Sequence, residues 1–83
     1  MKKIELNSEF ADTLLEAMET NGYDEKVVKE SKQGNTLYRY VSRTFAYEGK
    51  AYVAEMTLWA EHGTQDFDNG NVDALYEGPE IAN

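Results

Sequence analysis

The sequence predicts an α+β fold in which one N-terminal helix packs on an antiparallel sheet of three to four strands, arranged as a meander. Three observations lead to this prediction. Residues 36–62 hold six of the ten aromatic residues and alternate apolar with polar positions, as two long strands do. Residues 8–21 carry apolar side chains at helical spacing. Residues 63–83 are acidic with few apolar anchors, so we expect an acidic C-terminal arm.

The chain has 83 residues, which predicts a single small domain spanning 1–83. It has no cysteine, which excludes disulfides and thiolate metal sites and fits a reducing cytoplasm. Two lysines near the start are not followed by an apolar run, so no signal peptide is expected. No apolar run approaches the roughly 20 residues that cross a bilayer. We therefore expect a cytoplasmic protein.

A helix is predicted over residues 8–21, with Asn7 or Ser8 as its N-cap and Gly22 as its C-cap. Two acidic residues in its first turn would interact favourably with the positive end of the helix dipole. A weaker alternation over residues 2–6 allows a short first strand. The apolar side chains at helical spacing, which we expect to pack on the sheet, are Phe10, Leu14, Ala17 and Met18.

The strands over 36–47 and 51–62 are predicted to form a long hairpin around a tight turn at Glu48-Gly49, where glycine supplies the positive φ. This register pairs Tyr47 with Lys50, Phe45 with Tyr52, Arg43 with Ala54, Val41 with Met56, Arg39 with Leu58 and Leu37 with Ala60. One face of the hairpin is then apolar except for two arginines.

Arg39 and Arg43 have three possible explanations at this point. Their aliphatic stems can pack on the sheet with the charged heads in water. They can pair with helix acids such as Asp12 or Glu16. Alternatively, the register is wrong by one residue and they face solvent. The first two explanations are favoured over the third.

Residues 25–32 are predicted to be a further strand, because a helix over 24–33 would have little apolar face to bury. A two-helix fold is the alternative. In the last third, Asn69-Gly70 predicts a short hairpin, and Gly78-Pro79 is expected to end any element.

The second face of the hairpin carries Tyr38, Tyr40 and Trp59, residue types that are enriched at protein interfaces. If the helix covers only the first face, this patch is exposed and requires a partner. If the C-terminal arm folds over it, Leu75 and Tyr76 cover it instead. In either case we expect the acidic arm and the aromatic patch to be neighbours.

The net charge of −8 is unevenly distributed along the chain. Residues 1–50 carry nine acidic and eight basic groups, whereas residues 51–83 carry seven acidic groups and no Lys or Arg. This argues against direct binding to nucleic acid or to an anionic membrane and favours a protein partner with a basic surface. The alternative is that the acids only solvate the C-terminal third. The candidate partner-binding residues are Tyr38, Tyr40, Trp59, Glu55, Glu61, Asp66, Asp68, Asp73 and Glu77.

No catalytic, cofactor or metal site is predicted. Asp66, Asp68 and Glu77 have the spacing of the acidic ligands in a calcium loop, but Gly70 falls at the fifth position instead of the sixth. A calcium-binding module is therefore a remote alternative. His62 is the only histidine, so no zinc triad of histidines can form.

These observations favour a small acidic, non-enzymatic interaction protein that inhibits or modulates a partner by occupying a basic surface of the nucleic-acid-binding type. Small size, acidity and lack of motif are expected of inhibitors carried by phages and mobile elements. The main alternative is a homo-oligomeric structural or regulatory domain, in which the aromatic face pairs with its own copy across a two-fold axis.

Overall fold

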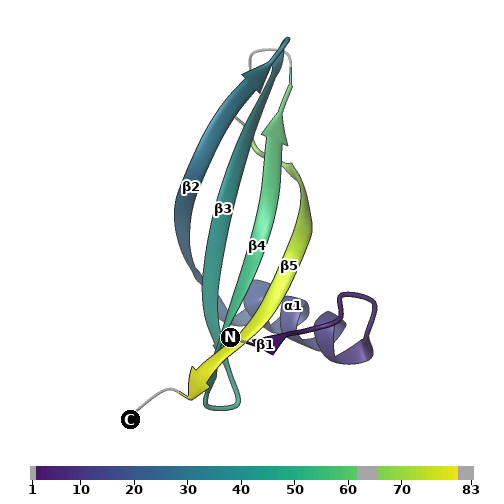
Figure 1. Cartoon of the computed structure of the whole chain (residues 1–83), viewed down its shortest axis with the longest axis vertical. Coiled ribbons are helices and arrows are strands. Elements are labelled where there is room, and N and C mark those ends of the chain that lie inside the picture. Colours follow the sequence, from purple (N-terminus) through teal and green to yellow (C-terminus); the bar gives the residue numbers. More distant parts are fainter. Residues whose placement is uncertain (1, 62–65, 81–83) are drawn as a thin grey trace.

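The computed structural model describes residues 2–61 and 66–80. The elements in this part of the chain are β1 (Lys2–Lys3), α1 (Glu9–Asn21), β2 (Asp24–Gln33), β3 (Thr36–Tyr47), β4 (Lys50–Ala60) and β5 (Asn69–Glu80). The strands form one antiparallel sheet in the order β1-β5-β4-β3-β2 (Figure 1). The α+β class with a helix on an antiparallel sheet is confirmed. The predicted number of three to four strands is wrong, because the described residues form five.

The helix begins and ends at the two predicted caps. The Ser8 Oγ accepts a hydrogen bond from the N–H of Ala11 at 3.1 Å, which satisfies one of the free donors of the first turn. Gly22 has a φ of 94° and its N–H donates to the Met18 carbonyl at 3.0 Å. Only glycine adopts such a backbone conformation without strain, so the helix ends there.

The apolar side of α1 packs on the sheet, although one predicted core residue lies at its margin. Ala11, Leu14 and Met18 are almost completely buried. Phe10 is 45% exposed, so the prediction that it is buried is wrong. Its ring instead makes a T-shaped contact with the buried Tyr52 ring, with 6.1 Å between centroids. Phe10 therefore shields the rim of the core from water.

The β3–β4 hairpin has the register that the sequence predicts, from Tyr47–Lys50 at the turn to Leu37–Ala60 at the far end. Both turn residues have positive φ, 49° at Glu48 and 79° at Gly49. Such a turn matches the right-handed twist of the flanking strands. A register error of one residue is thereby ruled out as the explanation of the two arginines.

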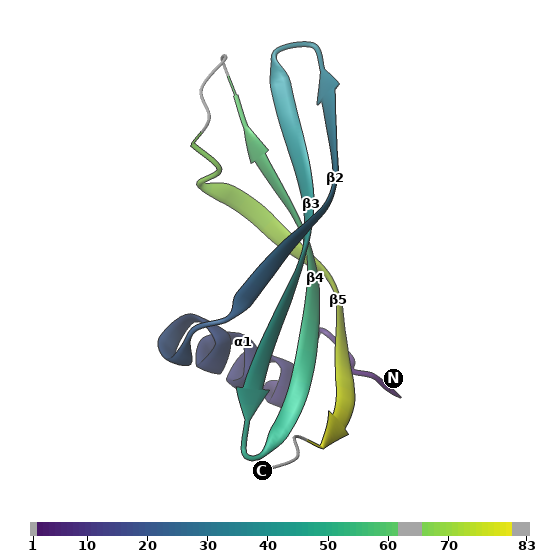
Figure 2. The ribbon, with the colours of Figure 1, turned by 90° about the vertical axis from the view of Figure 1, so that its left-hand side faces the viewer.

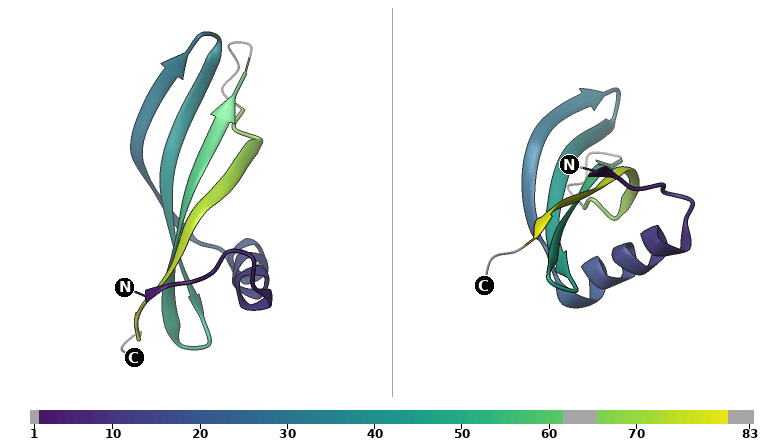
Figure 3. Two further views of the ribbon diagram at one scale, coloured as in Figure 1. Left: turned by 45° about the vertical axis from the view of Figure 1, so that its right-hand side comes forward. Right: turned by 60° about the horizontal axis from the view of Figure 1, so that its bottom comes forward.

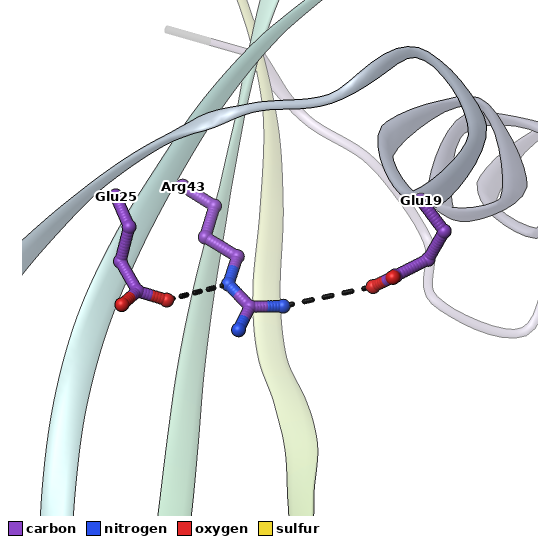
Figure 4. Close-up of polar contacts among 3 residues, drawn as sticks. All are labelled: Glu19, Glu25 and Arg43. Carbon is purple, nitrogen blue, oxygen red and sulfur yellow. Dashed lines mark hydrogen bonds and ion pairs between the residues drawn. The ribbon is translucent and has the colours of Figure 1, made fainter. Parts of the chain in front are cut away.

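Arg43 joins the helix to the sheet (Figure 4). Its Nε donates to Glu25 of β2 at 2.8 Å, and its Nη1 lies 3.6 Å from a carboxylate oxygen of Glu19 on α1. The guanidinium carbon also lies 4.3 Å from the centroid of the Tyr23 ring. Arg43 therefore does pair with a helix acid, but the residue is Glu19 and not Asp12 or Glu16.

Residues 24–33 form an edge strand, so the two-helix alternative is wrong. β2 pairs with β3 from Gln33–Thr36 to Asp24–Thr44. The register shifts between Val27 and Lys29, which marks a β-bulge with one extra residue in β2.

The C-terminal third differs most from its prediction. It is neither a hairpin nor an arm, because residues from Asn69 to Glu80 form one strand paired with β4. Gly70 stands opposite Leu58, and a Cβ built on Gly70 would lie 2.6 Å from the Leu58 Cδ2. The glycine therefore makes room for a core side chain instead of making a turn. Residues 62–65 and 81–83, including His62, lie outside the described residues.

Gly78 and Pro79 do not end β5 as predicted. The pairing with β4 shifts register between Tyr52–Glu77 and Lys50–Glu80, and both residues fall within this irregularity. At such a position the hydrogen bond that proline cannot donate is not required.

The molecule is elongated, with extents of 43 × 26 × 22 Å. The strongly twisted sheet runs along its length, and α1 lies beside one end of it only (Figures 2 and 3). The main core lies at this end, between α1 and one face of the sheet. The fully or nearly buried members of that core are Ile4, Ala11, Leu14, Met18, Phe45, Tyr52, Ala54 and Leu75. We name this face the helix-side face and the opposite one the open face.

Candidate functional site

The open face carries the three predicted aromatic residues. Tyr38 of β3 is the direct cross-strand partner of Trp59 of β4. Tyr40, two residues further along β3, has its side chain on the same side, because side chains alternate along a strand. All three are half-buried, and no described helix lies over them. Tyr38, Tyr40 and Trp59 therefore form an accessible aromatic strip, which is the name used below.

Acidic side chains border the strip on the β4–β5 side, as expected for neighbours of the C-terminal third. Asp73 of β5 accepts hydrogen bonds from the Thr57 Oγ1, at 2.5 Å, and from the Asn71 Nδ2, at 2.7 Å. Glu55 lies one step further along β4 on the same face. Neither carboxylate has a basic partner in the described residues, so both negative charges are available to a ligand. Glu61 follows β4 at the far end of the sheet and is exposed.

Asp73 owes its position to a β-bulge. The pairing of β4 with β5 shifts register between Glu55–Ala74 and Met56–Val72, so one extra residue stands on β5. This extra residue is Asp73, and its hydrogen bonds to Thr57 and Asn71 show that it points to the open face. Bulges of this kind redirect a side chain, and here the result is a carboxylate beside the aromatic strip.

Asp66 and Asp68 lie in the segment that leads into β5, and both are exposed. The residue between them, Phe67, packs against the guanidinium of Arg39, 4.1 Å from the guanidinium carbon to the ring centroid. Arg39 belongs to the helix-side face, because it lies four residues before Arg43 on β3 and side chains alternate between the two faces of a strand. The two aspartates therefore lie on either side of Phe67, which contacts Arg39 on the helix-side face, at the end of the sheet away from the helix.

Glu77 lies apart from the other candidate residues. It is the cross-strand partner of Tyr52 on the helix-side face, and it accepts a hydrogen bond from the Lys50 Nζ at 2.9 Å. That hydrogen bond holds the pKa of Glu77 below its ordinary value. Burial raises the pKa of the neighbouring Tyr52, and the charge of Glu77 adds to this effect. The ion pair gives Glu77 a structural role, distinct from the open face.

Two lysines on the open face were not among the predicted site residues. Lys26 and Lys29 of β2 pair with Ser42 and Tyr40 of β3, and the Lys29 Nζ lies 6.0 Å from the Tyr40 ring centroid. Strict alternation would place residues 26 and 29 on opposite faces. The β2 bulge puts them on the same face, and no glycine or other sequence signal marks that bulge.

The calcium-loop alternative is not supported by the geometry. Asp66 and Asp68 precede β5, whereas Glu77 lies eight residues beyond its first residue, which is about 26 Å along an extended strand. The three carboxylates therefore cannot surround one ion. Within residues 2–61 and 66–80, no group of three or more metal-ligating side chains converges.

Two surface depressions are found among residues 2–61 and 66–80, and neither encloses a site for a small molecule. One of about 330 Å³ lies beside the β1–α1 connection and is lined by residues including Ile4, Leu6 and Asp73. Another of about 340 Å³ lies where α1 meets β2, near Tyr23 and Phe45. Both are open and shallow, whereas ligand sites generally bury most of the ligand surface.

No helix in the described part of the chain is long and apolar enough to cross a membrane. Comparisons with protein-family models, with curated proteins and with solved structures found no match to this chain. The open face, with its aromatic strip and bordering charges, is therefore the candidate site on geometric grounds alone.

Proposed function

We propose that this chain is a small acidic, non-enzymatic interaction protein that acts in the cytoplasm and binds a protein partner through the open face. The partner presents a basic surface of the nucleic-acid-binding type, and occupation of that surface inhibits or modulates it. The observation that carries the proposal is the aromatic strip, which no described helix covers, bordered by the carboxylates of Glu55 and Asp73.

Aromatic and acidic groups have different parts in such a complex. Half-buried Tyr and Trp side chains supply contact area at low entropic cost and often provide most of the binding energy. Carboxylates without basic partners speed the encounter with a basic surface and select its orientation. Asp73 is held in place by Thr57 and Asn71, so little ordering of its side chain is required on binding.

The proposal is tested by capture of the partner from the native cells, its identification by mass spectrometry, and binding kinetics with the purified pair. The open-face variant Glu55→Gln/Asp73→Asn should lower the association rate constant about tenfold at low salt and flatten its salt dependence. Trp59→Ala should act mainly on the dissociation rate.

The matched control is Asp12→Asn/Glu16→Gln, which removes the same charge from the exposed side of α1. It should leave the association rate constant close to that of the wild type. If both double variants slow association equally, only net charge matters and the open face is not the binding site. If neither does, the acidic residues only solvate the protein.

A further inference from the structure

The open face is divided by charge across its width. The cross-strand rows place Lys29, Tyr40, Thr57 and Asn71 side by side, with Asp73 hydrogen-bonded to the last two. The next row adds Lys26 on β2 and Glu55 on β4. In these two rows, positive charge therefore lies on the β2 side of the aromatic strip and negative charge on the β4–β5 side, whereas Asp24 of β2, opposite Thr44, adds a carboxylate nearer the helix end.

When two copies of the open face meet, only one orientation of the two-fold axis brings opposite charges together. When two copies meet face to face, a two-fold axis that lies in the interface and perpendicular to the strands places each strand over its own copy, so β2 with its lysines lies over β2 of the second copy. An axis parallel to the strands instead places β2 over β5 of the second copy, and lysines meet carboxylates. Opposite charges across an interface fix its register, whereas like charges oppose it.

We propose that the open face pairs with the open face of a second copy of this chain, about a two-fold axis parallel to β3 and β4. Lys29 then lies opposite Asp73 of the second copy, and Tyr38 packs over Trp59 of the second copy. Residues that contact each other do so twice, as in any isologous interface. Given the proposed function, on which this last step rests, the dimer covers the partner-binding face and the partner competes with it.

The free edge of β2 is a less suitable place for a second copy. Val27 and Val28 are exposed there, but the bulge between Val27 and Lys29 interrupts the row of backbone donors and acceptors. Bulges and lysines on an edge strand are the features that prevent edge-to-edge pairing. Self-association is therefore expected through the face and not through the edge.

The size of the open face predicts a weak dimer. Four strands about 4.8 Å apart and about seven residues at 3.3 Å each give on the order of 450 Å² of flat area per copy. Stable complexes bury roughly 800 Å² per partner, so an interface of this size belongs with weak, transient contacts. The net charge of −8 opposes association, and salt weakens this repulsion, with a screening length of about 8 Å at physiological ionic strength.

The test is sedimentation equilibrium of the purified protein over a range from micromolar to millimolar concentration. The wild type should pass reversibly from monomer to dimer, and the fluorescence of Trp59, the only tryptophan, should shift to shorter wavelength as it does so. Lys29→Glu and Asp73→Lys should each remain monomeric at concentrations where the wild type is dimeric. An equimolar mixture of the two variants should form a heterodimer, because both charge pairs are then restored.

The control is Lys32→Glu, which makes the same charge change on β2 but on the helix-side face, and it should dimerise like the wild type. Circular dichroism verifies folding. If Asp73→Lys does not fold, Lys26→Glu mixed with Glu55→Lys replaces the first pair of variants, because these two side chains lie only one strand apart across the proposed interface. A wild type that stays monomeric at millimolar concentration, or a mixture that does not associate, overturns the dimer. Either result leaves partner binding by the monomer untouched, because no partner is present in the experiment.

Discussion

The guanidinium of Arg39 lies over the ring of Phe67, with 4.1 Å between the guanidinium carbon and the ring centroid. Arg39 also donates from Nε to Glu30 of β2 at 2.8 Å. This arrangement connects β2, β3 and the segment before β5 at the end of the sheet that α1 does not reach. Leu58 and Ala60 are nevertheless buried there, at 7% and 1% exposure. Arg39 and Phe67 therefore help to close the end of the core that lacks a helix.

Phe67→Ala should destabilise the fold modestly and locally. It removes a half-buried ring and a cation–π contact, the latter worth about 0.5–1 kcal/mol at an exposed site. Urea unfolding of Phe67→Ala, Arg39→Ala and the double variant gives the coupling energy directly. A coupling near zero would mean that the two side chains only lie near each other.

Arg43→Ala should cost more than Arg39→Ala, because the Arg43 side chain is only 11% exposed against 32% for Arg39. Its removal leaves Glu25 without its charged partner and removes packing from Tyr23, so we expect a loss of about 2 kcal/mol. Arg43→Lys should recover only part of this, since one ammonium cannot reproduce the planar contacts. Equal unfolding free energies for Arg39→Ala and Arg43→Ala would contradict this ranking.

Leu14→Ala and Phe10→Ala test where the core ends. Leu14 is fully buried, so its truncation should cost about 2–5 kcal/mol. Phe10 is 45% exposed, and its truncation should cost about 1 kcal/mol through loss of the edge contact with Tyr52. Thermal and urea unfolding of both variants measure the difference. A Phe10→Ala variant as unstable as Leu14→Ala would place Phe10 inside the core.

Gly70→Ala should destabilise the protein although glycine is a poor strand residue. The new Cβ would lie 2.6 Å from the Leu58 Cδ2 and 3.2 Å from the Thr57 carbonyl oxygen, so Leu58 has to move. Overpacking of this kind costs about 1–3 kcal/mol. Leu58→Val in the same chain should recover part of the loss, because it shortens the side chain that is in the way. No recovery would mean that the backbone of Thr57 is the obstacle.

The fold was predictable where hydrophobic periodicity and turn chemistry agree. It was not predictable where a glycine can either form a turn or leave room for a neighbouring side chain within a strand. The caps Ser8 and Gly22 and the β3–β4 register follow from local rules. Asn69-Gly70 satisfies the same turn rule, yet Gly70 lies inside a strand because Leu58 fills the space of its absent side chain. That requirement depends on β4, which is distant in the sequence.

The candidate site was predictable in part for similar reasons. The alternation of side chains along β3 and β4, together with the register set by the turn, places Tyr38 and Trp59 on one face. The acids of the last third are close in sequence but not in space, because β5 alternates between faces and spreads them along the sheet. Asp73 reaches the open face through a bulge, whereas Glu77 pairs with Lys50 on the other face. Neither position can be derived from composition.

The Glu77–Lys50 pair predicts how stability depends on pH. The hydrogen bond from Lys50 lowers the pKa of Glu77 from its ordinary value of 4.5. A carboxyl whose pKa is lower in the folded chain than in the unfolded chain stabilises the fold fully above the unfolded value. This contribution is lost as the pH falls through the lower, folded pKa. The midpoint of thermal unfolding of the wild type should therefore exceed that of Glu77→Gln by a constant amount above about pH 5.5, where the unfolded carboxyl is ionised.

Below pH 4.5 the two midpoints should converge, since protonated Glu77 and glutamine are both neutral. The contribution is small, because the Glu77 and Lys50 side chains are 24% and 42% exposed and water screens the pair. The matched control is Glu16→Gln on the exposed side of α1, where Glu16 has no ion pair among the described residues. Its midpoint of thermal unfolding should be close to that of the wild type at neutral pH. A wild-type advantage over Glu77→Gln that is as large at pH 3 as at pH 7 would show that the side chain stabilises the sheet through packing, and not through its charge.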